Sequence, residues 1–188
     1  VINLGHHPPS NAYLTEEQLA LPEITYPLKV FVCSNCWLMQ LPAHAAADQL
    51  FTSDYAYFSS TSSSWCAHAK SFVTQAIDRL KLDQTSYVIE LASNDGYLLQ
   101  YVKQQGIPCL GIEPTHATAE AARAKGIETF EEFFGIDLAE KLTKADLIVA
   151  NNVLAHVPDI NDFVAGIRCL LKPDGQASIE FPHLLNLL

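Results

Sequence analysis

The feature that most constrains the fold of this chain is the stretch VIELASNDGYLL at residues 88–99. Its first four residues are mainly β-branched or apolar, which predicts a buried strand of a parallel sheet. Small and turn-forming residues follow, and Gly96 precedes apolar residues at helical spacing, at Leu98, Leu99 and Val102. A strand, a tight turn and a helix form a corner where the backbone can approach a ligand closely and where helix N–H groups are free.

The residues of this turn favour a cationic ligand over a phosphate. A dinucleotide-binding turn prefers glycine at all three turn positions, so that the backbone can lie against a pyrophosphate. Here two of the three positions hold Ala92 and Asn94, and the acidic Glu90 precedes them. A carboxylate would repel a pyrophosphate, whereas it suits S-adenosylmethionine (SAM), which carries an ammonium and a sulfonium. The alternative is an ordinary strand-to-helix turn with Glu90 solvated at its rim.

The stretch resembles the first motif of SAM-dependent methyltransferases with a Rossmann-like fold, in the variant E-x-x-S-N-D-G at residues 90–96. That resemblance makes the residues of the turn and the acid before it candidates for cofactor binding: Glu90, Ala92, Ser93, Asn94, Asp95 and Gly96.

Length and charge limit the other possibilities. The 188 residues, 49% of them hydrophobic, suffice for one domain and a small module. A formal net charge of −10 with singly scattered Lys and Arg argues against a nucleic-acid partner. No apolar run reaches the length of a membrane span, and five cysteines, two of them in expected core elements, favour a reducing, cytoplasmic compartment. Because the chain begins without methionine and ends in an apolar run, we expect a piece of a longer protein.

Residues 1–60 predict a small separate module. Residues 4–11 are dense in turn formers and predict a loop. Strands are expected at residues 28–32 and 37–41, on either side of a C-x-x-C sequence, which is the layout of half a zinc ribbon. Residues 51–60 alternate aromatic and hydroxyl side chains, which indicates an edge strand or an extended loop.

The C-x-x-C pair, Cys33 and Cys36, is the candidate metal site. Two thiolates at this spacing can hold one tetrahedral zinc ion, but closing the site needs two further ligands. These would come from His6 or His7, or from cysteines that precede Val1. A redox pair and two free cysteines in a turn are the alternatives, although a redox C-x-x-C normally opens a helix.

Residues 61–188 alternate between strand and helix patterns, which predicts a doubly wound α/β sheet of the Rossmann-like kind. The expected strands are residues 87–91, 108–112, 127–129, 146–150 and 176–181, with a turn at 173–175 and helices between the strands.

Ligands of such sheets lie across the carboxyl ends of the strands, which selects further candidates. Glu113 ends the second strand about twenty residues after the turn, where a carboxylate can accept ribose hydroxyl protons. Pro114, the next residue, is a further candidate for cofactor binding. For Glu113, a surface glutamate before Pro114 is the alternative. Phe130 ends the third strand and could flank the adenine, although core packing explains it equally well.

The fourth strand ends in Asn151 and Asn152, whose amides could hold the amino-acid end of SAM. His156 follows on the next turn, beside the expected position of the sulfonium. A lone histidine is usually structural, and that alternative applies to His156 as well.

The order of these motifs resembles the sugar C-methyltransferase family that carries an N-terminal zinc-binding domain. The resemblance extends over nearly the whole chain and rests on L-G-x-x-P-x-x-N at residues 4–11, C-x-x-C-x-L-x-Q at 33–40, Y-x-Y-x-S-S at 55–60, E-x-x-S-N-D-G at 90–96, G-I-E-P at 111–114 and N-N-V-x-x-H at 151–156.

The resemblance implies methylation of a carbon of a nucleotide-linked 4-keto deoxysugar, or of a related carbonyl acceptor, with SAM as donor. It implies catalytic roles for Tyr57 and His156, with Tyr55 as the substitute if the loop register differs by two. It implies that the family's first C-x-x-C lies before Val1 and its catalytic Y-x-E-H after Leu188, so this chain alone should be inactive. Oxygen or nitrogen methylation of another small molecule, a zinc-ribbon scaffold and an NAD-dependent enzyme are the rival interpretations.

Overall fold

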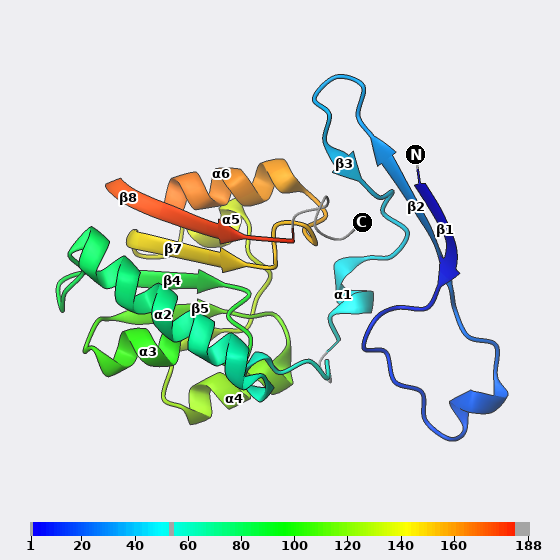
Figure 1. The fold of residues 1–188 in the computed structure, drawn as a ribbon, viewed down its shortest axis with the longest axis horizontal. Helices are drawn as coiled ribbons and strands as arrows, with labels where there is room; N and C mark the ends of the chain where they lie inside the picture. Colours follow the sequence, from blue (N-terminus) through cyan, green and yellow to red (C-terminus); the bar gives the residue numbers. More distant parts are fainter. Residues whose placement is uncertain (1, 53–54, 183–188) are drawn as a thin grey trace. The chain divides into compact units, whose positions relative to one another are not determined.

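The computed structural model describes residues 2–52 and 55–182 of the chain, which form two compact units, Val1–Tyr57 and Phe58–Leu188 (Figure 1). The expected boundary after residue 60 stays a prediction. Within the described ranges, no helix is both long enough and apolar enough to span a bilayer.

The first unit is built on a three-stranded antiparallel sheet in the order β1-β2-β3. Its strands are β1 (Ile2–His7), β2 (Tyr26–Val32) and β3 (Met39–Gln40), accompanied by the short 3-10 helix η1 (Gln18–Ala20) and the short helix α1 (Ala47–Leu50). The loop expected at residues 4–11 was wrong in its first half, which belongs to β1. A bulge between Asn3 and His6, with Gly5 at φ +87°, lets these turn-forming residues stay paired with β2.

The second unit is a doubly wound α/β sheet, which confirms the expected fold class. Five parallel strands lie in the order β6-β5-β4-β7-β8, with β4 in the centre. Its elements are η2 (Ser59–Thr61), α2 (Ser63–Leu80), β4 (Val88–Leu91), α3 (Leu99–Gln104), β5 (Cys109–Ile112), α4 (His116–Ala124), β6 (Thr129–Phe130), α5 (Ile136–Ala139), β7 (Ala145–Asn151), α6 (Ile160–Leu170) and β8 (Leu171–Glu180).

Hydrophobic cores cover both faces of this sheet, because successive residues of β4 point to opposite sides. Val88 belongs to a core that includes buried residues of α2, α3 and α4, whereas Ile89 and Leu91 belong to one that includes residues of α5 and α6 (Figure 1). All four residues of β4 are buried, as expected for the central strand of a parallel sheet.

The ends of the elements follow local signals. Asp159 caps α6 by accepting hydrogen bonds from the backbone N–H groups of Asn161 and Asp162, and Ser62 caps α2. The expected turn at residues 173–175 lies within β8, where a register shift against β7 absorbs it. The chain therefore passes from α6 into β8 without a separate loop.

Candidate functional site

The turn after β4 has the backbone of a glycine-rich turn without its first two glycines. Ala92, Asn94 and Gly96 all have left-handed φ angles, at +54°, +50° and +72°. Asparagine tolerates this region, whereas alanine is strained in it. Gly96 alone could not carry a side chain, because an added Cβ would collide with Ile127 and crowd Ala122. The turn thus keeps the geometry for close backbone approach at the cost of strain at Ala92.

Ala92→Gly should relieve that strain and raise the free energy of unfolding by about 1 kcal/mol. Ala121→Gly, in the middle of α4, is the control and should lower it by about 1 kcal/mol, because glycine is a poor helix former. Denaturant titration measures both changes. If Ala92→Gly destabilised the protein as much as Ala121→Gly does, the left-handed strain would be disproved.

The carboxyl group of Glu90 is the most unusual group of the turn. Its side chain is 1% exposed, and within the described part of the chain neither carboxylate oxygen has a hydrogen-bond partner. Burial raises the pKa of Glu90 well above its usual value. The Tyr97 hydroxyl, which lies nearby but outside hydrogen-bonding geometry, opposes the shift, and the nearby carboxylates of Glu113 and Asp95 add to it. Burying a carboxylate without a partner is costly. A cationic ligand that paired with Glu90 would offset this cost, so the position favours a cation.

An aromatic and amide cluster is built around Tyr97, whose hydroxyl lies near Glu90. The Tyr97 hydroxyl accepts a hydrogen bond of 3.2 Å from Asn151 Nδ2, and its ring stacks on Trp65 of α2 at a centroid distance of 5.9 Å. Burial raises the pKa of Tyr97, which keeps the hydroxyl protonated. His68 of α2 pairs with Glu180, the last residue of β8, at 2.8 Å. Sequence reasoning missed Tyr97 and Trp65, whose apolar spacing resembles that of ordinary core residues.

Glu113, at the carboxyl end of β5, lies against the same turn. Its Oε2 accepts a hydrogen bond of 2.9 Å from the backbone N–H of Asn94, and its Oε1 accepts from the N–H and the hydroxyl of Thr115, at 3.0 and 2.5 Å. The side chain is only 4% exposed. Because each carboxylate oxygen can accept two hydrogen bonds, Oε2 keeps one acceptor site for a ligand hydroxyl.

The side chains of Asn94 and Asp95 point to the segment before α2. Asn94 Oδ1 accepts a hydrogen bond of 2.8 Å from the backbone N–H of Ser59, and Asp95 accepts from both the N–H and the hydroxyl of Ser60. Lys125 donates to the Asp95 carboxylate at 3.1 Å and to its carbonyl oxygen at 2.6 Å. Asp95 is 2% exposed, so these partners occupy its carboxylate.

The remaining candidates lie at the carboxyl ends of the strands, as the fold requires. Pro114 is half-buried after β5, Phe130 ends β6 and is 38% exposed, and Asn151 ends β7. Asn152 follows at φ +53°, and its N–H donates to the carbonyl oxygen of Glu180 at 2.7 Å. The His156 residue is exposed as a whole, but partial desolvation of its imidazole by the surrounding residues lowers its pKa.

The last two candidates, Ser93 and Tyr57, differ from these in burial or in the unit to which they belong. Ser93 is fully buried, and its Oγ has no partner among the described residues, so it faces the interior rather than an open crevice. Tyr57 is 47% exposed and is the last residue of the first unit.

Cys33 and Cys36 lie in the connection between β2 and β3, as the sequence predicts. The N–H of Asn35 donates to Cys33 Sγ at 3.4 Å. Hydrogen bonds from the backbone of Cys36 and of Asn35, and the Cys36 thiol, lower the pKa of Cys33, which favours the thiolate that zinc binds. Among the described residues, no group of three His, Cys, Asp or Glu ligand atoms within 4.8 Å of one another contains both thiols, so neither His6 nor His7 completes the site in this structure. The pair fits one half of a tetrahedral zinc site.

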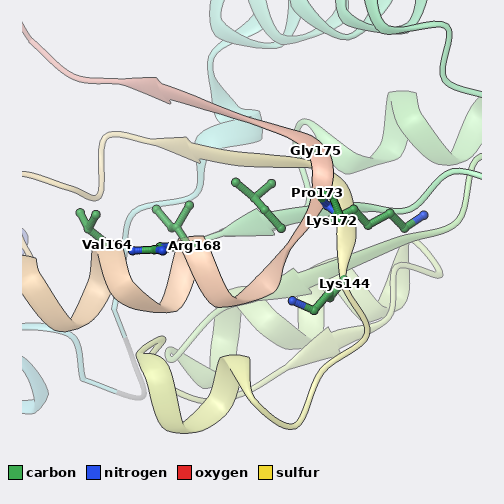
Figure 2. Close-up of a pocket in the computed structure, with 8 residues that line it drawn as sticks. Lys144, Val164, Arg168, Lys172, Pro173 and Gly175 are labelled. Carbon is green, nitrogen blue, oxygen red and sulfur yellow. The ribbon is translucent and has the colours of Figure 1, made fainter.

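A cavity of about 450 Å³ lies at the opposite, amino-terminal end of β7 and β8 (Figure 2). Lys144, Arg168 and Lys172 line it, but Lys144 donates to the Cys169 carbonyl and Lys172 pairs with Asp146. Figure 2 shows that the three cationic ends do not converge on one point. The cavity therefore lacks the convergent polar groups of a donor site.

Comparison with known proteins agrees with this geometry. The family model "Methyltransferase domain" matches residues 65–185, and the model "Putative zinc binding domain" matches residues 1–51. The chain belongs to the methyltransferase domain family. The match to the methyltransferase domain covers every strand of the parallel sheet and all of the turn after β4.

Individual relatives share this domain. The C-methyltransferase NovU of Streptomyces niveus is 33% identical over 192 residues, which cover 100% of this chain and 46% of NovU. A ubiquinone biosynthesis O-methyltransferase of Histophilus somni (strain 2336) is 33% identical over 98 residues, 47% of this chain and 41% of the relative. The chain spans less than half the length of both. The PH0226 protein of Pyrococcus horikoshii OT3 has the same fold, with a TM-score of 0.56 at 19% identity over 70% of this chain and 60% of that protein.

Proposed function

We propose that the full-length protein transfers a methyl group from SAM to a carbon next to a ketone, on a nucleotide-linked 4-keto deoxysugar or a similar carbonyl acceptor. The observation that carries this proposal is the buried carboxylate of Glu90, which has no hydrogen-bond partner among the described residues and directly precedes a turn with left-handed φ angles. Such a group attracts the cationic donor and repels a pyrophosphate. The name of the relative NovU supports carbon as the methylated atom.

SAM supplies an electrophilic methyl group on a sulfonium. In our proposal Glu90 and the Oδ1 of Asn151 hold its ammonium, because Asn151 Nδ2 already donates to Tyr97. Glu113 Oε2 accepts a ribose hydroxyl, Phe130 and Pro114 flank the adenine, and the backbone of residues 92–96 and of Asn152 provides close contact.

The acceptor carbon becomes a nucleophile only after a general base takes up its proton, a role that the resemblance gives to the histidine of the family's Y-x-E-H motif. The resulting enolate attacks the methyl group, and S-adenosylhomocysteine leaves. We assign Tyr57 and His156 to the acceptor side, where a hydroxyl and an imidazole can donate hydrogen bonds to the enolate oxygen. The lowered pKa of His156 keeps its imidazole neutral near pH 7, with one N–H to donate. Hydrogen bonds from these groups to the enolate oxygen would stabilise the enolate and orient its carbon for in-line attack on the methyl group of SAM.

The position of the transferred methyl tests the proposal. Full-length protein is incubated with methyl-labelled SAM and a nucleotide-linked 4-keto deoxysugar, and NMR locates the label. We expect a carbon-bound methyl group, and we expect the proton next to the ketone to exchange in D2O. A label on oxygen would favour the second candidate, an O-methyltransferase, which the ubiquinone biosynthesis relative supports. If no methyl group were transferred to any acceptor, the proposed activity would be rejected in favour of a non-catalytic scaffold.

We further propose that Cys33 and Cys36 hold a structural zinc ion together with two more ligands. A chelator should then lower the melting temperature of the first unit, since zinc binding contributes directly to folding. The affinity for SAM should not change by more than about twofold, because the proposed donor residues all belong to the second unit. Calorimetry with and without chelator measures both quantities. Equal melting curves, or a large loss of SAM affinity, would contradict this role.

A further inference from the structure

Asn94 and Asp95 sit in the turn that the proposed function assigns to SAM, yet their side chains serve a different segment. Among the described residues, Asp95 Oδ1 and Oδ2 accept hydrogen bonds from Ser60 and Lys125 alone. Asn94 Oδ1 accepts from Ser59, which is itself 5% exposed. Both side chains thus reach 35 residues back along the chain.

The segment that they hold is fixed from its other side as well. Ser62 caps α2 by accepting from the N–H of Trp65 at 3.3 Å, and Thr61 Oγ1 donates to the Phe58 carbonyl at 2.7 Å. The 3-10 helix η2 (Ser59–Thr61) therefore connects the turn to the start of α2 with little freedom. Lys125, the residue after α4, also holds Asp95 through an ion pair with its carboxylate and a hydrogen bond to its carbonyl oxygen.

Tyr57 lies two residues before Ser59, so its Cα cannot be more than about 7 Å from that of Ser59. A shift of the anchored segment would consequently move the tyrosine with it. Misplacement of a reacting group by about 1 Å can cost a factor of about 100 in rate. A carboxylate that only bound the donor would instead face the donor and leave Ser60 free.

We infer that Asp95, with Ser60 as its partner, is a positioning residue of the proposed reaction, which ties the donor-binding turn to the acceptor-side Tyr57 through η2. This inference rests on the proposed function. In this inference the Asp95 carboxylate holds Tyr57 in position for the reaction, and the backbone of the turn, rather than this carboxylate, contacts the methyl donor.

The test compares variants of the full-length protein. Asp95→Asn keeps the size of the side chain but replaces the Oδ2 acceptor with a donor, which removes the acceptor of the bonds from the Ser60 hydroxyl and from Lys125 and leaves only the bond from the Ser60 N–H. We expect kcat to fall about 100-fold while the Kd for SAM, measured by calorimetry, changes less than about threefold. Ser60→Ala should give the same pattern, and Ser60→Thr, which keeps the hydroxyl, should restore kcat.

Asp146→Asn is the matched control, because Asp146 also accepts from a backbone N–H and a lysine, Tyr87 and Lys172, but at the far end of the sheet. It should leave kcat and the Kd for SAM unchanged. Thermal melting of both variants shows whether folding is affected equally. If Asp95→Asn did not fold, the Ser60 variants would decide.

A double-mutant cycle separates positioning from other roles. In the background of Tyr57→Phe, Asp95→Asn should cost less than about threefold, because both substitutions then remove the same contribution. A full loss in that background would overturn the inference, and so would a rise in the Kd for SAM that accounts for the whole effect. Absence of methyl transfer by the unaltered protein would instead end the proposed function. In that case amide hydrogen exchange tests the inference separately. SAM should protect the Ser59 and Ser60 amides in the unaltered protein but not in Asp95→Asn. Equal protection in both proteins would overturn the inference.

Discussion

Glu90→Gln should weaken SAM binding by about 100-fold and at the same time stabilise the donor-free protein. The loss of affinity follows because a charge-assisted hydrogen bond to a buried carboxylate contributes about 1.5–3 kcal/mol. The gain in stability follows because both carboxylate oxygens of Glu90 are buried without a partner in the described part of the chain. A neutral amide of the same shape avoids the cost of desolvating or protonating a carboxylate when the protein folds.

The gain in stability should depend on pH in a defined direction. Burial raises the pKa of Glu90 in the folded protein, so the folded state keeps a proton that the unfolded state releases above about pH 4.3. The contribution of Glu90 to stability therefore falls as the pH rises from the unfolded pKa towards the folded pKa. The difference in free energy of unfolding between Glu90→Gln and the unaltered protein should grow over this window, by up to about 1.4 kcal/mol per pH unit.

Denaturant titrations between about pH 5 and 8 measure this difference. Glu140→Gln, an exposed glutamate on the same unit, is the control and should change neither stability nor SAM affinity. Calorimetry in two buffers of different ionisation enthalpy should also detect proton release on SAM binding, which Glu90→Gln abolishes. If Glu90→Gln bound SAM as tightly as the unaltered protein, the cationic site would be disproved.

Tyr57→Phe should lower kcat by a factor of about 100 to 10,000, which is the usual contribution of a positioned proton donor or acceptor. The Kd for SAM should remain within about threefold, because the hydroxyl acts on the acceptor in our proposal. Tyr55→Phe is the control, since Tyr55 shares the motif but should not touch the reacting atoms. Equal losses in turnover and in SAM affinity would contradict the role of Tyr57. A loss confined to Tyr55→Phe would transfer the role to Tyr55.

The order of strands and helices could be predicted from the sequence because its signals are local. Apolar runs such as residues 88–91 and helical spacings such as that of α2 are confirmed, as is the position of the C-x-x-C pair between β2 and β3. The loop expected at residues 4–7 was wrong because pairing with β2 outweighs the local preference of Gly5 and the histidines. The turn at residues 173–175 was likewise absorbed into a strand.

The environment of the site depends on contacts that the sequence does not encode locally. The burial of Glu90 follows from helices packed on both faces of the sheet, whereas the sequence left a solvated position at the rim of the turn as an alternative. The left-handed angle of Ala92 could not be inferred from a residue type that avoids this region. The bonds from Asp95 to Ser60 join residues 35 positions apart, and two serines in a motif give no signal of their partner.

The most direct test of the central claim is calorimetric titration of the full-length protein with SAM and, separately, with NADH. The full-length protein should bind the cationic methyl donor at the turn that follows Glu90 and show no detectable heat with the pyrophosphate-bearing dinucleotide. Preferential binding of NADH would contradict our assignment of the site to a methyl donor.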